Sequence, residues 1–120
     1  LSPLYPIEID VNLINRVISN LVENALKYAG EGSTVVISTW DDKDFVYIEI
    51  KDNGVGIQED DLKNIFEKFY RVRNDSVHKV KGSGLGLYLV KYFIELHHGE
   101  INVFSKPSEG TKFIIKLINA

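Results

Sequence analysis

The feature that most constrains the fold is a change in the spacing of apolar residues along the chain. Over residues 11–28 apolar side chains recur at every third or fourth position, which is typical of one amphipathic helix. This apolar stripe consists of Ile14, Val17, Ile18, Leu21 and Ala25. Several later segments alternate apolar and polar residues, which is typical of β-strands. We therefore expect a helical layer that packs against a sheet.

Further elements follow from the same patterns and from the positions of turn residues. In chain order we expect an edge strand or extended entry at 3–9, a helix at 11–28, a β-hairpin of strands 35–40 and 45–50, a short helix at 59–65, a helix at 85–97, and closing strands at 101–105 and 112–117. Asp10 would cap the start of the first helix and Gly30 its end. Because few strands are joined by crossover helices, the sheet should be mixed and mostly antiparallel, with the helices on one face. The predicted fold class is a two-layer α/β (α+β) sandwich, in a single domain over 1–120.

The composition is that of an ordinary soluble domain, and it excludes several functions. Apolar residues make up 44% and charged residues 26% of the chain, and no apolar run approaches the roughly 20 residues of a membrane span. The net charge of -3 argues against a nucleic-acid surface, and the absence of cysteine excludes disulfides and thiol catalysis. The chain starts at Leu1 rather than Met, so we expect it to be part of a longer protein.

A polar strip on the first helix is the first candidate for function. Asn20, Asn24 and Lys27 are spaced i, i+4 and i+7, so they share one face, roughly 130° around from the apolar stripe. One interpretation is a solvated polar face. The other is a metal and phosphate site, because amide oxygens are hard ligands that suit Mg²⁺ and a lysine one turn on can meet the same phosphates. Asn is a poor helix former, which favours a specific role.

Asp52 is the second candidate, because it continues the inward register of Val46, Ile48 and Ile50. A carboxylate on the core side of a sheet is costly unless a donor reaches it. It could form an Asx-turn with the two residues that follow, or accept a hydrogen bond from a ligand amino group such as that of adenine. In the second case Gly54 and Gly56 would let the backbone approach a flat base.

A glycine-rich segment at residues 82–87 (GSGLGL) leads into the helix expected at 85–97. Glycines that uncover backbone N–H groups at a helix start form anion sites. A dinucleotide-binding fold is excluded because a polar loop, and not a strand, precedes this segment. The lysine pattern of the P-loop and the Asp-Phe-Gly signature of protein kinases are missing as well. The basic residues nearby suit a small anion better than a polyanion. They are Lys68, Arg71, Arg73, Lys79 and Lys81.

The histidines and the clustered aromatic residues have simpler explanations. His97 and His98 lie beside Gly99 at a helix end, where interaction with the helix dipole explains them better than metal binding. His78 lies in the polar loop, where we expect it to be solvated. The aromatic residues expected to act as packing anchors are Phe66, Phe69 and Tyr70.

Five segments together resemble, in order, the catalytic ATP-binding domain of bacterial sensor histidine kinases, which has the GHKL or Bergerat fold. Residues 20–28 (NLVENALKY) look like its N box, and residues 52–56 (DNGVG) like its first glycine box. Residues 66–71 (FEKFYR) look like its F box, and residues 82–87 like its second glycine box. Residues 110–113 (GTKF) are similar to its closing segment. The resemblance covers most of the chain from residue 10 onward.

The resemblance implies roles for individual residues. Asn20 and Asn24 would coordinate Mg²⁺ and the ATP phosphates, and Lys27 would contact phosphate, so these three form the implied catalytic set. Tyr28 would pack on adenine, Asp52 would accept its amino group, and residues 72–83 would form a lid. The residues implied to surround the nucleotide are Tyr28, Asp52, Gly54, Gly56, Ile57, Phe69, Arg71, Gly82, Ser83, Gly84, Leu85, Gly86 and Thr111.

Asn20 also separates the branches of the superfamily. Its ATPases and serine kinases resemble one another in having a glutamate, one turn before the metal-binding Asn, that acts as general base. Here that position is an amide, which cannot accept a proton at neutral pH. Glu23 is a poor substitute, because it faces away from the polar strip by about 100°. The resemblance therefore favours the histidine-kinase branch, with a GHKL ATPase, a serine kinase or a non-catalytic nucleotide sensor as the alternatives.

The family pattern also predicts what surrounds such a domain. The phosphoacceptor histidine lies on a separate helical dimerisation domain, and none of the three histidines here has that context. We expect this chain to bind Mg-ATP as a monomer and to phosphorylate that partner domain within a homodimeric parent. The phosphoryl group would pass on to a response regulator receiver domain. The expected location is cytoplasmic, with an inner-membrane sensor as a candidate parent, and no nucleic acid takes part.

Overall fold

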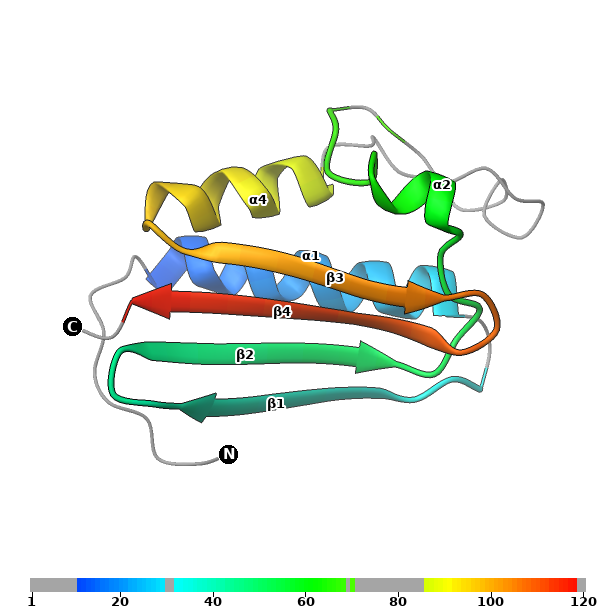
Figure 1. The fold of residues 1–120 in the computed structure, drawn as a ribbon, viewed down its shortest axis with the longest axis horizontal. Helices are drawn as coiled ribbons and strands as arrows, with labels where there is room; N and C mark the ends of the chain where they lie inside the picture. The colour runs from blue at the N-terminus through cyan, green and yellow to red at the C-terminus, as the bar shows by residue number, and fades with distance from the viewer. Residues whose placement is uncertain (1–10, 30–31, 69, 71–85, 119–120) are drawn as a thin grey trace.

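The helical layer and the sheet are both present in the computed structural model, which describes residues 11–29, 32–68, 70 and 86–118. Figure 1 shows the elements in their chain order. They are α1 (Val11–Ala29), β1 (Val35–Asp41), β2 (Phe45–Asp52), α2 (Glu59–Leu62), α4 (Gly86–Leu96), β3 (Glu100–Lys106) and β4 (Gly110–Ile118). The predicted strand at 3–9 and the predicted caps Asp10 and Gly30 lie outside the described residues.

The described strands form one sheet in the order β1-β2-β4-β3, and each neighbouring pair is antiparallel (Figure 1). The prediction of a mostly antiparallel sheet is therefore confirmed, and no parallel pair occurs among these four strands. The closing strands begin and end one to two residues beyond the predicted limits, because β4 pairs with the whole of β2 as far as Asp52.

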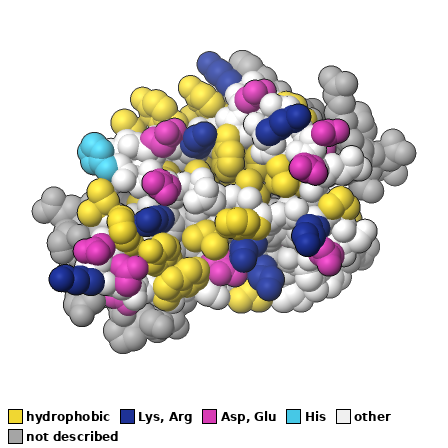
Figure 2. All heavy atoms as spheres, viewed as in Figure 1, with side chains coloured by type: hydrophobic (Ala, Val, Ile, Leu, Met, Phe, Trp, Pro, Cys, Tyr) yellow, Lys and Arg dark blue, Asp and Glu magenta, His cyan; other side chains and the backbone are white. Residues whose placement is uncertain are grey.

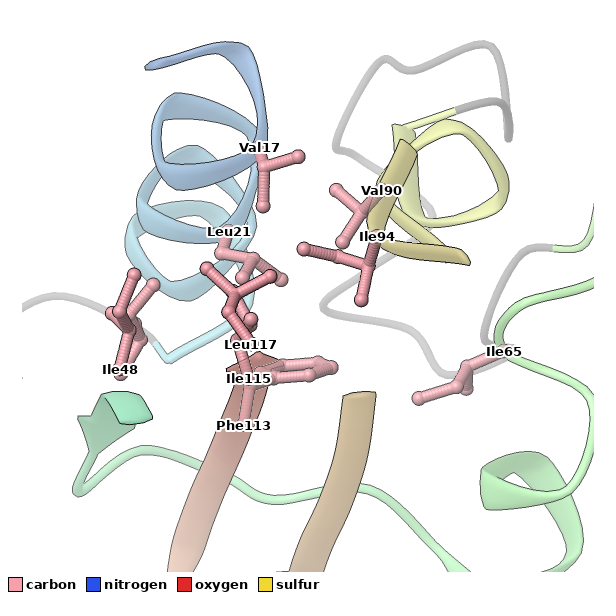
Figure 3. Close-up of a cluster of buried hydrophobic side chains, with 10 residues drawn as sticks. Val17, Leu21, Ile48, Ile65, Val90, Ile94, Phe113, Ile115 and Leu117 are labelled. Carbon is pink, nitrogen blue, oxygen red and sulfur yellow. The ribbon is translucent and has the colours of Figure 1, made fainter. Parts of the chain in front are cut away.

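The core lies between the inner face of the sheet and the helices α1 and α4. Figure 3 shows side chains from both helices and from the strands converging there. The cluster consists of Val17, Leu21, Ile48, Ile50, Ile65, Val90, Ile94, Phe113, Ile115 and Leu117. Full burial of one such side chain stabilises the fold by about 1.5–3 kcal/mol. The predicted stripe of the first helix is confirmed, since Val17, Leu21 and Ala25 are all buried.

The helix predicted at 59–65 is shorter than expected. Its acidic first turn, Glu59 to Asp61, suits the positive end of a helix dipole. After Leu62 the chain continues in successive tight turns, in which Asn64 N–H donates to Asp61 O and Glu67 N–H to Asn64 O. The prediction was wrong about its length because the apolar spacing of this stretch fits a series of tight turns as well as a continuous helix.

Among the described residues, no helix covers the outer face of the sheet, and the side chains on this face include aromatic groups and lysines. Figure 2, from the same side as Figure 1, shows hydrophobic groups interspersed with charged ones over the strands. Trp40 stacks on Tyr47 with the ring centroids 5.3 Å apart, and Lys116 Nζ lies 3.9 Å from the centroid of the Phe45 ring. Within the described residues, no helix is both long and apolar enough to span a membrane.

Candidate functional site

The segments singled out in the sequence meet at one end of the molecule. Figure 1 shows the end of β2, the β3–β4 turn, α2 and the C-terminal end of α1 at the same side, with α4 starting towards it. Asp52 and Thr111 are direct cross-strand partners on β2 and β4. On the helical side, a Cβ built on Gly86 would lie 3.8 Å from Asn24 Nδ2. Segments distant in sequence therefore form one candidate site with a strand side and a helix side.

Asp52 lies where its register predicts, on the inner face at the end of β2, with 7% of its surface exposed. Its Oδ1 accepts hydrogen bonds from Gly54 N–H at 2.9 Å and from Thr111 N–H at 3.3 Å. The Asx-turn considered from the sequence is thus present, but it uses only Oδ1. Oδ2 receives no hydrogen bond from the residues that the structure describes, so this oxygen can still accept one from a ligand.

Two glycines hold the backbones of this end in close contact. Gly110 has φ +100, and a Cβ there would lie 2.1 Å from Asp52 O. Gly56 has φ +75, and a Cβ there would lie 2.0 Å from Lys106 O. Both positions need glycine because the backbone is left-handed and the space is filled. This packing is a reason for Gly56 that the sequence did not reveal, and the approach of a base to Gly56 stays a prediction.

Ser105 on β3 is a site residue that sequence reasoning missed. Its Oγ accepts a hydrogen bond from Ile57 N–H at 2.7 Å, donates to Gly110 O at 2.8 Å and lies 2.8 Å from Thr111 Oγ1. The signal that could have found it is the inward alternation of β3, in which Ser105 follows Ile101 and Val103 and stands opposite Thr111. Using that signal required the register of the closing hairpin, which was not predicted.

The helix side of the site lies where α1 meets α4. Asn20 and Asn24 are half-buried, and no side-chain hydrogen bond joins either of them to the described residues. Asn20 also borders a hollow of about 350 Å³ between the two helices. The residues that line the hollow are Asn15, Arg16, Ser19, Asn20, Leu89 and Phe93. The two asparagines of the predicted polar strip therefore border the α1–α4 junction and are not fully solvated. Within the described residues, no group of three or more His, Cys, Asp or Glu could hold a metal ion.

Several predicted site residues lie outside the part of the chain that the structure describes. Lys27 and Tyr28 continue α1, but their side chains lie outside the described part, as does the predicted lid at 72–83. The other predicted nucleotide neighbours that lie outside it are Phe69, Arg71, Gly82, Ser83, Gly84 and Leu85. The predicted packing anchors that are described do pack. Phe66 makes an edge contact with Phe113, and the Tyr70 hydroxyl donates to Asp61 Oδ1.

Several other polar groups have structural partners away from the site. His97 Nδ1 lies 2.9 Å from Phe93 O, and His98 has φ +58, so both histidines lie just beyond the end of α4, while their interaction with the helix dipole stays a prediction. In the β1–β2 turn, backbone N–H groups of Phe45 and Asp44 hold the pKa of Asp42 below its ordinary value of 3.8. The pKa of Tyr47 is raised, mainly because of desolvation and secondly because its hydroxyl donates a hydrogen bond to Asp42.

An antiparallel sheet covered on one face by helices, with glycine turns and an amide-bearing helix at one end, has the architecture of Bergerat-fold ATP-binding domains. Residues 9–119 match the family model of the histidine kinase-, DNA gyrase B- and HSP90-like ATPases, and the chain belongs to this family. The family resemblance predicted from the five motifs is thereby confirmed.

The individual matches are sensor histidine kinases. The chain is 46% identical over 106 residues to the sensor protein RprX of Bacteroides fragilis, covering 87% of this chain and 20% of RprX. The fold of the mycobacterial sensor histidine kinase MprB is similar, with a TM-score of 0.84, 28% identity, and coverage of 95% of this chain and 77% of that one. Full-length ShkA in complex with AMPPNP gives a TM-score of 0.83 at 26% identity, covering 99% of this chain and 24% of that one. The chain spans about a fifth of the length of the curated relatives it matches. The part matched is the catalytic, ATP-binding kinase domain.

Proposed function

We propose that this chain binds Mg-ATP and donates the γ-phosphoryl group to a histidine on a separate helical dimerisation domain. The observation that carries the proposal is the presence of an asparagine at position 20. By the family resemblance, members that activate water or serine have a glutamate there as general base. Here the residue is an amide, and no carboxylate is among the described residues that line the adjoining hollow. A site without a base suits a nucleophile that needs none, such as a neutral imidazole nitrogen.

The helix side is the proposed phosphate end. Asn20 and Asn24 present amide groups one turn apart, without a competing side-chain hydrogen bond to the described residues. Their chemistry fits Mg²⁺, which takes a few hard oxygen ligands and fills its sphere with water and phosphate oxygens. When bound, Mg²⁺ would neutralise the charge that develops on the phosphates. Gly86 opens α4 beside Asn24, so backbone N–H groups at that helix start face the same region. Lys27 would contact phosphate from the next turn of α1.

The strand side is the proposed base end. Asp52 would accept the exocyclic amine of adenine through Oδ2, because Oδ1 already accepts two backbone hydrogen bonds. The glycine turn from Gly54 to Ile57 and the Thr111 side chain would border the base, and Tyr28 would pack on it from α1. The reason that supports this assignment is the burial of Asp52. A carboxylate with 7% exposure, one oxygen of which accepts no hydrogen bond from the described residues, favours a ligand that donates a hydrogen bond there.

The transfer step requires positioning and charge stabilisation more than covalent chemistry from this chain. A nitrogen of the incoming imidazole would form a bond to the γ-phosphorus while the bond from phosphorus to the β–γ bridging oxygen breaks. ADP leaves with that electron pair, and the imidazole proton passes to solvent. Asn20, Asn24 and Lys27 would hold the phosphates in line for this displacement and stabilise the negative charge that develops.

The proposed partners are those expected of a sensor histidine kinase, the kind of protein of which this chain matches one part. A helical histidine-bearing domain would lie in the same parent protein, a homodimer, and a response regulator receiver domain would accept the phosphoryl group from it. The chain alone would be monomeric, and its location would be cytoplasmic. These proposals rest on the sensor histidine kinases that the chain matches over about a fifth of their length.

The experiment that tests the proposal combines calorimetry with a phosphotransfer assay. The purified chain should bind Mg-ATP, hydrolyse it slowly and form no phosphohistidine alone. Addition of a helical domain from a close relative, carrying the histidine, should produce acid-labile phosphate on that domain, and a His→Gln change there should abolish it. Steady ATP hydrolysis that the helical domain leaves unchanged would favour a GHKL ATPase and contradict the proposal. Absence of Mg-ATP binding would indicate a non-catalytic module.

A further inference from the structure

Ser105 joins three segments of the proposed base end through one hydroxyl group. A serine hydroxyl has one proton to donate and two lone pairs to accept with. Gly110 O lies 2.8 Å from Ser105 Oγ and, as a carbonyl, can only accept, so it takes the serine proton. Ile57 N–H can only donate, so it takes one lone pair at 2.7 Å. One lone pair of Ser105 then remains.

The remaining lone pair decides the direction of the Thr111 hydroxyl. Thr111 Oγ1 lies 2.8 Å from Ser105 Oγ, a distance at which one of the two must donate. Because the Ser105 proton is used on Gly110 O, the Thr111 proton must point at Ser105. Thr111 Oγ1 therefore has no proton left to offer elsewhere, and towards any ligand it can act only as an acceptor.

This direction matters because Thr111 stands directly opposite Asp52. The two are cross-strand partners on the inner face, and each has 7% of its surface exposed. Oδ2 of Asp52 is an acceptor when the carboxylate is ionised, and Thr111 Oγ1 is an acceptor for the reason above. Among the described residues, the two side-chain atoms argued to lie at this edge, Asp52 Oδ2 and Thr111 Oγ1, are therefore both acceptors, which suit an amine with two N–H donors. In a base with a carbonyl at the same position, the carbonyl oxygen would face these two acceptors, and no hydrogen bond could form.

We propose that Ser105 is a positioning residue that fixes the Thr111 hydroxyl as an acceptor, and thereby sets the preference of the site for a 6-amino over a 6-oxo purine. The inference rests on the proposed nucleotide function and deepens it. Ser105 itself does not touch the base. It acts through Thr111 and, by holding Ile57 N–H, through the exit of the glycine turn.

The test compares ADP with inosine diphosphate, which has a carbonyl in place of the 6-amino group. Both dissociation constants are measured by calorimetry, and their ratio gives the base preference. In Ser105→Ala the Thr111 proton is released and can serve a 6-oxo group, so the preference for ADP should fall by about fivefold, the effect of about one hydrogen bond. Ser105→Thr keeps the hydroxyl and should restore the preference. Ser38→Ala, a serine on the outer face of β1, is the matched control and should leave it unchanged.

A second variant separates positioning from stability. Thr111→Val removes the hydroxyl that Ser105 orients, so it should lower the preference by a similar factor, and Ser105→Ala combined with it should lower it no further. Thermal unfolding followed by circular dichroism shows whether each variant is folded. An unchanged ADP preference in folded Ser105→Ala or in Thr111→Val would overturn the inference. Ser105 would then only hold neighbouring segments of the fold together. Absence of ADP binding by the unmodified chain would instead refute the proposed function itself.

Discussion

The two sides of the candidate site are built in different ways. On the strand side, Asp52, Ser105 and Thr111 are joined to each other and to the glycine turn by hydrogen bonds of 2.7–3.3 Å. On the helix side, Asn20 and Asn24 are carried by α1, and no side-chain hydrogen bond joins them to the described residues. The strand side is held together by hydrogen bonds within the chain, whereas the proposed metal and phosphate ligands of the helix side would keep their hydrogen-bonding capacity for the nucleotide.

This difference suits the two parts of a nucleotide. A flat base is recognised by a few fixed donors and acceptors, so preorganisation of Asp52 and Thr111 favours selectivity. The phosphate end has to accommodate a metal ion, its water ligands and a group that leaves, and side chains without prior partners serve that purpose. If the comparison is correct, damage to the strand side should change folding and base affinity, and damage to the helix side should change metal-dependent affinity.

The largest effect should come from Gly110→Ala, which breaks the strand side directly. The new Cβ would meet Asp52 O at 2.1 Å, and φ +100 is strained for alanine. We expect a loss of at least about 3 kcal/mol in the free energy of unfolding, measured by urea denaturation. Gly32→Ala is the matched control, because Gly32 has φ +81 but nothing within 4 Å of its Cβ position, so it should lose only about 1–2 kcal/mol. Equal losses in both variants would show that the close contact is unimportant.

The next effect should be that of Asp52→Ala on nucleotide affinity. Loss of a hydrogen bond to a charged group costs about 1.5–3 kcal/mol, so affinity should fall by roughly 10- to 150-fold. Because Asp52 would serve the base, ATP and ADP should weaken alike, with and without Mg²⁺, in calorimetric titrations. Asp42→Ala, another carboxylate that accepts from backbone N–H groups, should leave affinity unchanged. A loss of affinity restricted to ATP would indicate that Asp52 serves the γ-phosphate and not the base.

A smaller and more selective effect is expected for Asn24→Ala. Its affinity for Mg-ATP should fall roughly tenfold, about 1.4 kcal/mol, whereas affinity for ATP in excess EDTA should change little. The same titrations with Asn102→Ala, an exposed amide on the outer face of β3, provide the control. An equal loss with and without Mg²⁺ would contradict the assignment of Asn24 to the metal.

The smallest effect should come from Asp42, which lies in the β1–β2 turn away from the site. Its pKa in the folded chain is lowered by the N–H groups of Phe45 and Asp44, so the ionised form stabilises the fold. This contribution is complete above the ordinary value of 3.8 and is lost as the pH falls through the lower, folded value. Asp42→Asn should therefore melt slightly below the unmodified chain at pH 7, and the gap should close in strong acid. A difference in melting temperature that widens at acid pH would show that the fold raises the pKa of Asp42 and does not lower it.

The sequence predicted well what depends on local periodicity. The first helix was expected at 11–28 and spans Val11–Ala29, because its apolar spacing repeats over five turns. The inward position of Asp52 followed from simple alternation along its strand. These features need no knowledge of which strand pairs with which.

The features that the sequence did not predict depend on contacts between distant segments. Ser105 became visible only when β3 was placed against β4, and the role of Gly56 only when its turn met Lys106. The hydrogen bond from Tyr70 to Asp61 joins residues nearer in sequence, close to the turns that shorten the helix predicted at 59–65, and apolar spacing does not reveal it either. The predicted roles of Arg71 and Gly82 fall outside the described residues and stay predictions.

The close contact between Gly56 and Lys106 has a consequence for anyone who wishes to redesign this domain. The glycine turn and the β3–β4 hairpin share one space, since a Cβ on Gly56 would lie within 2.0 Å of Lys106 O and 3.1 Å of Pro107 Cα. A new turn that carries a side chain at position 56 would force the hairpin onto another path, and with it Ser105 and Thr111. The turn and the hairpin are therefore one transplantable module, and neither can be exchanged alone.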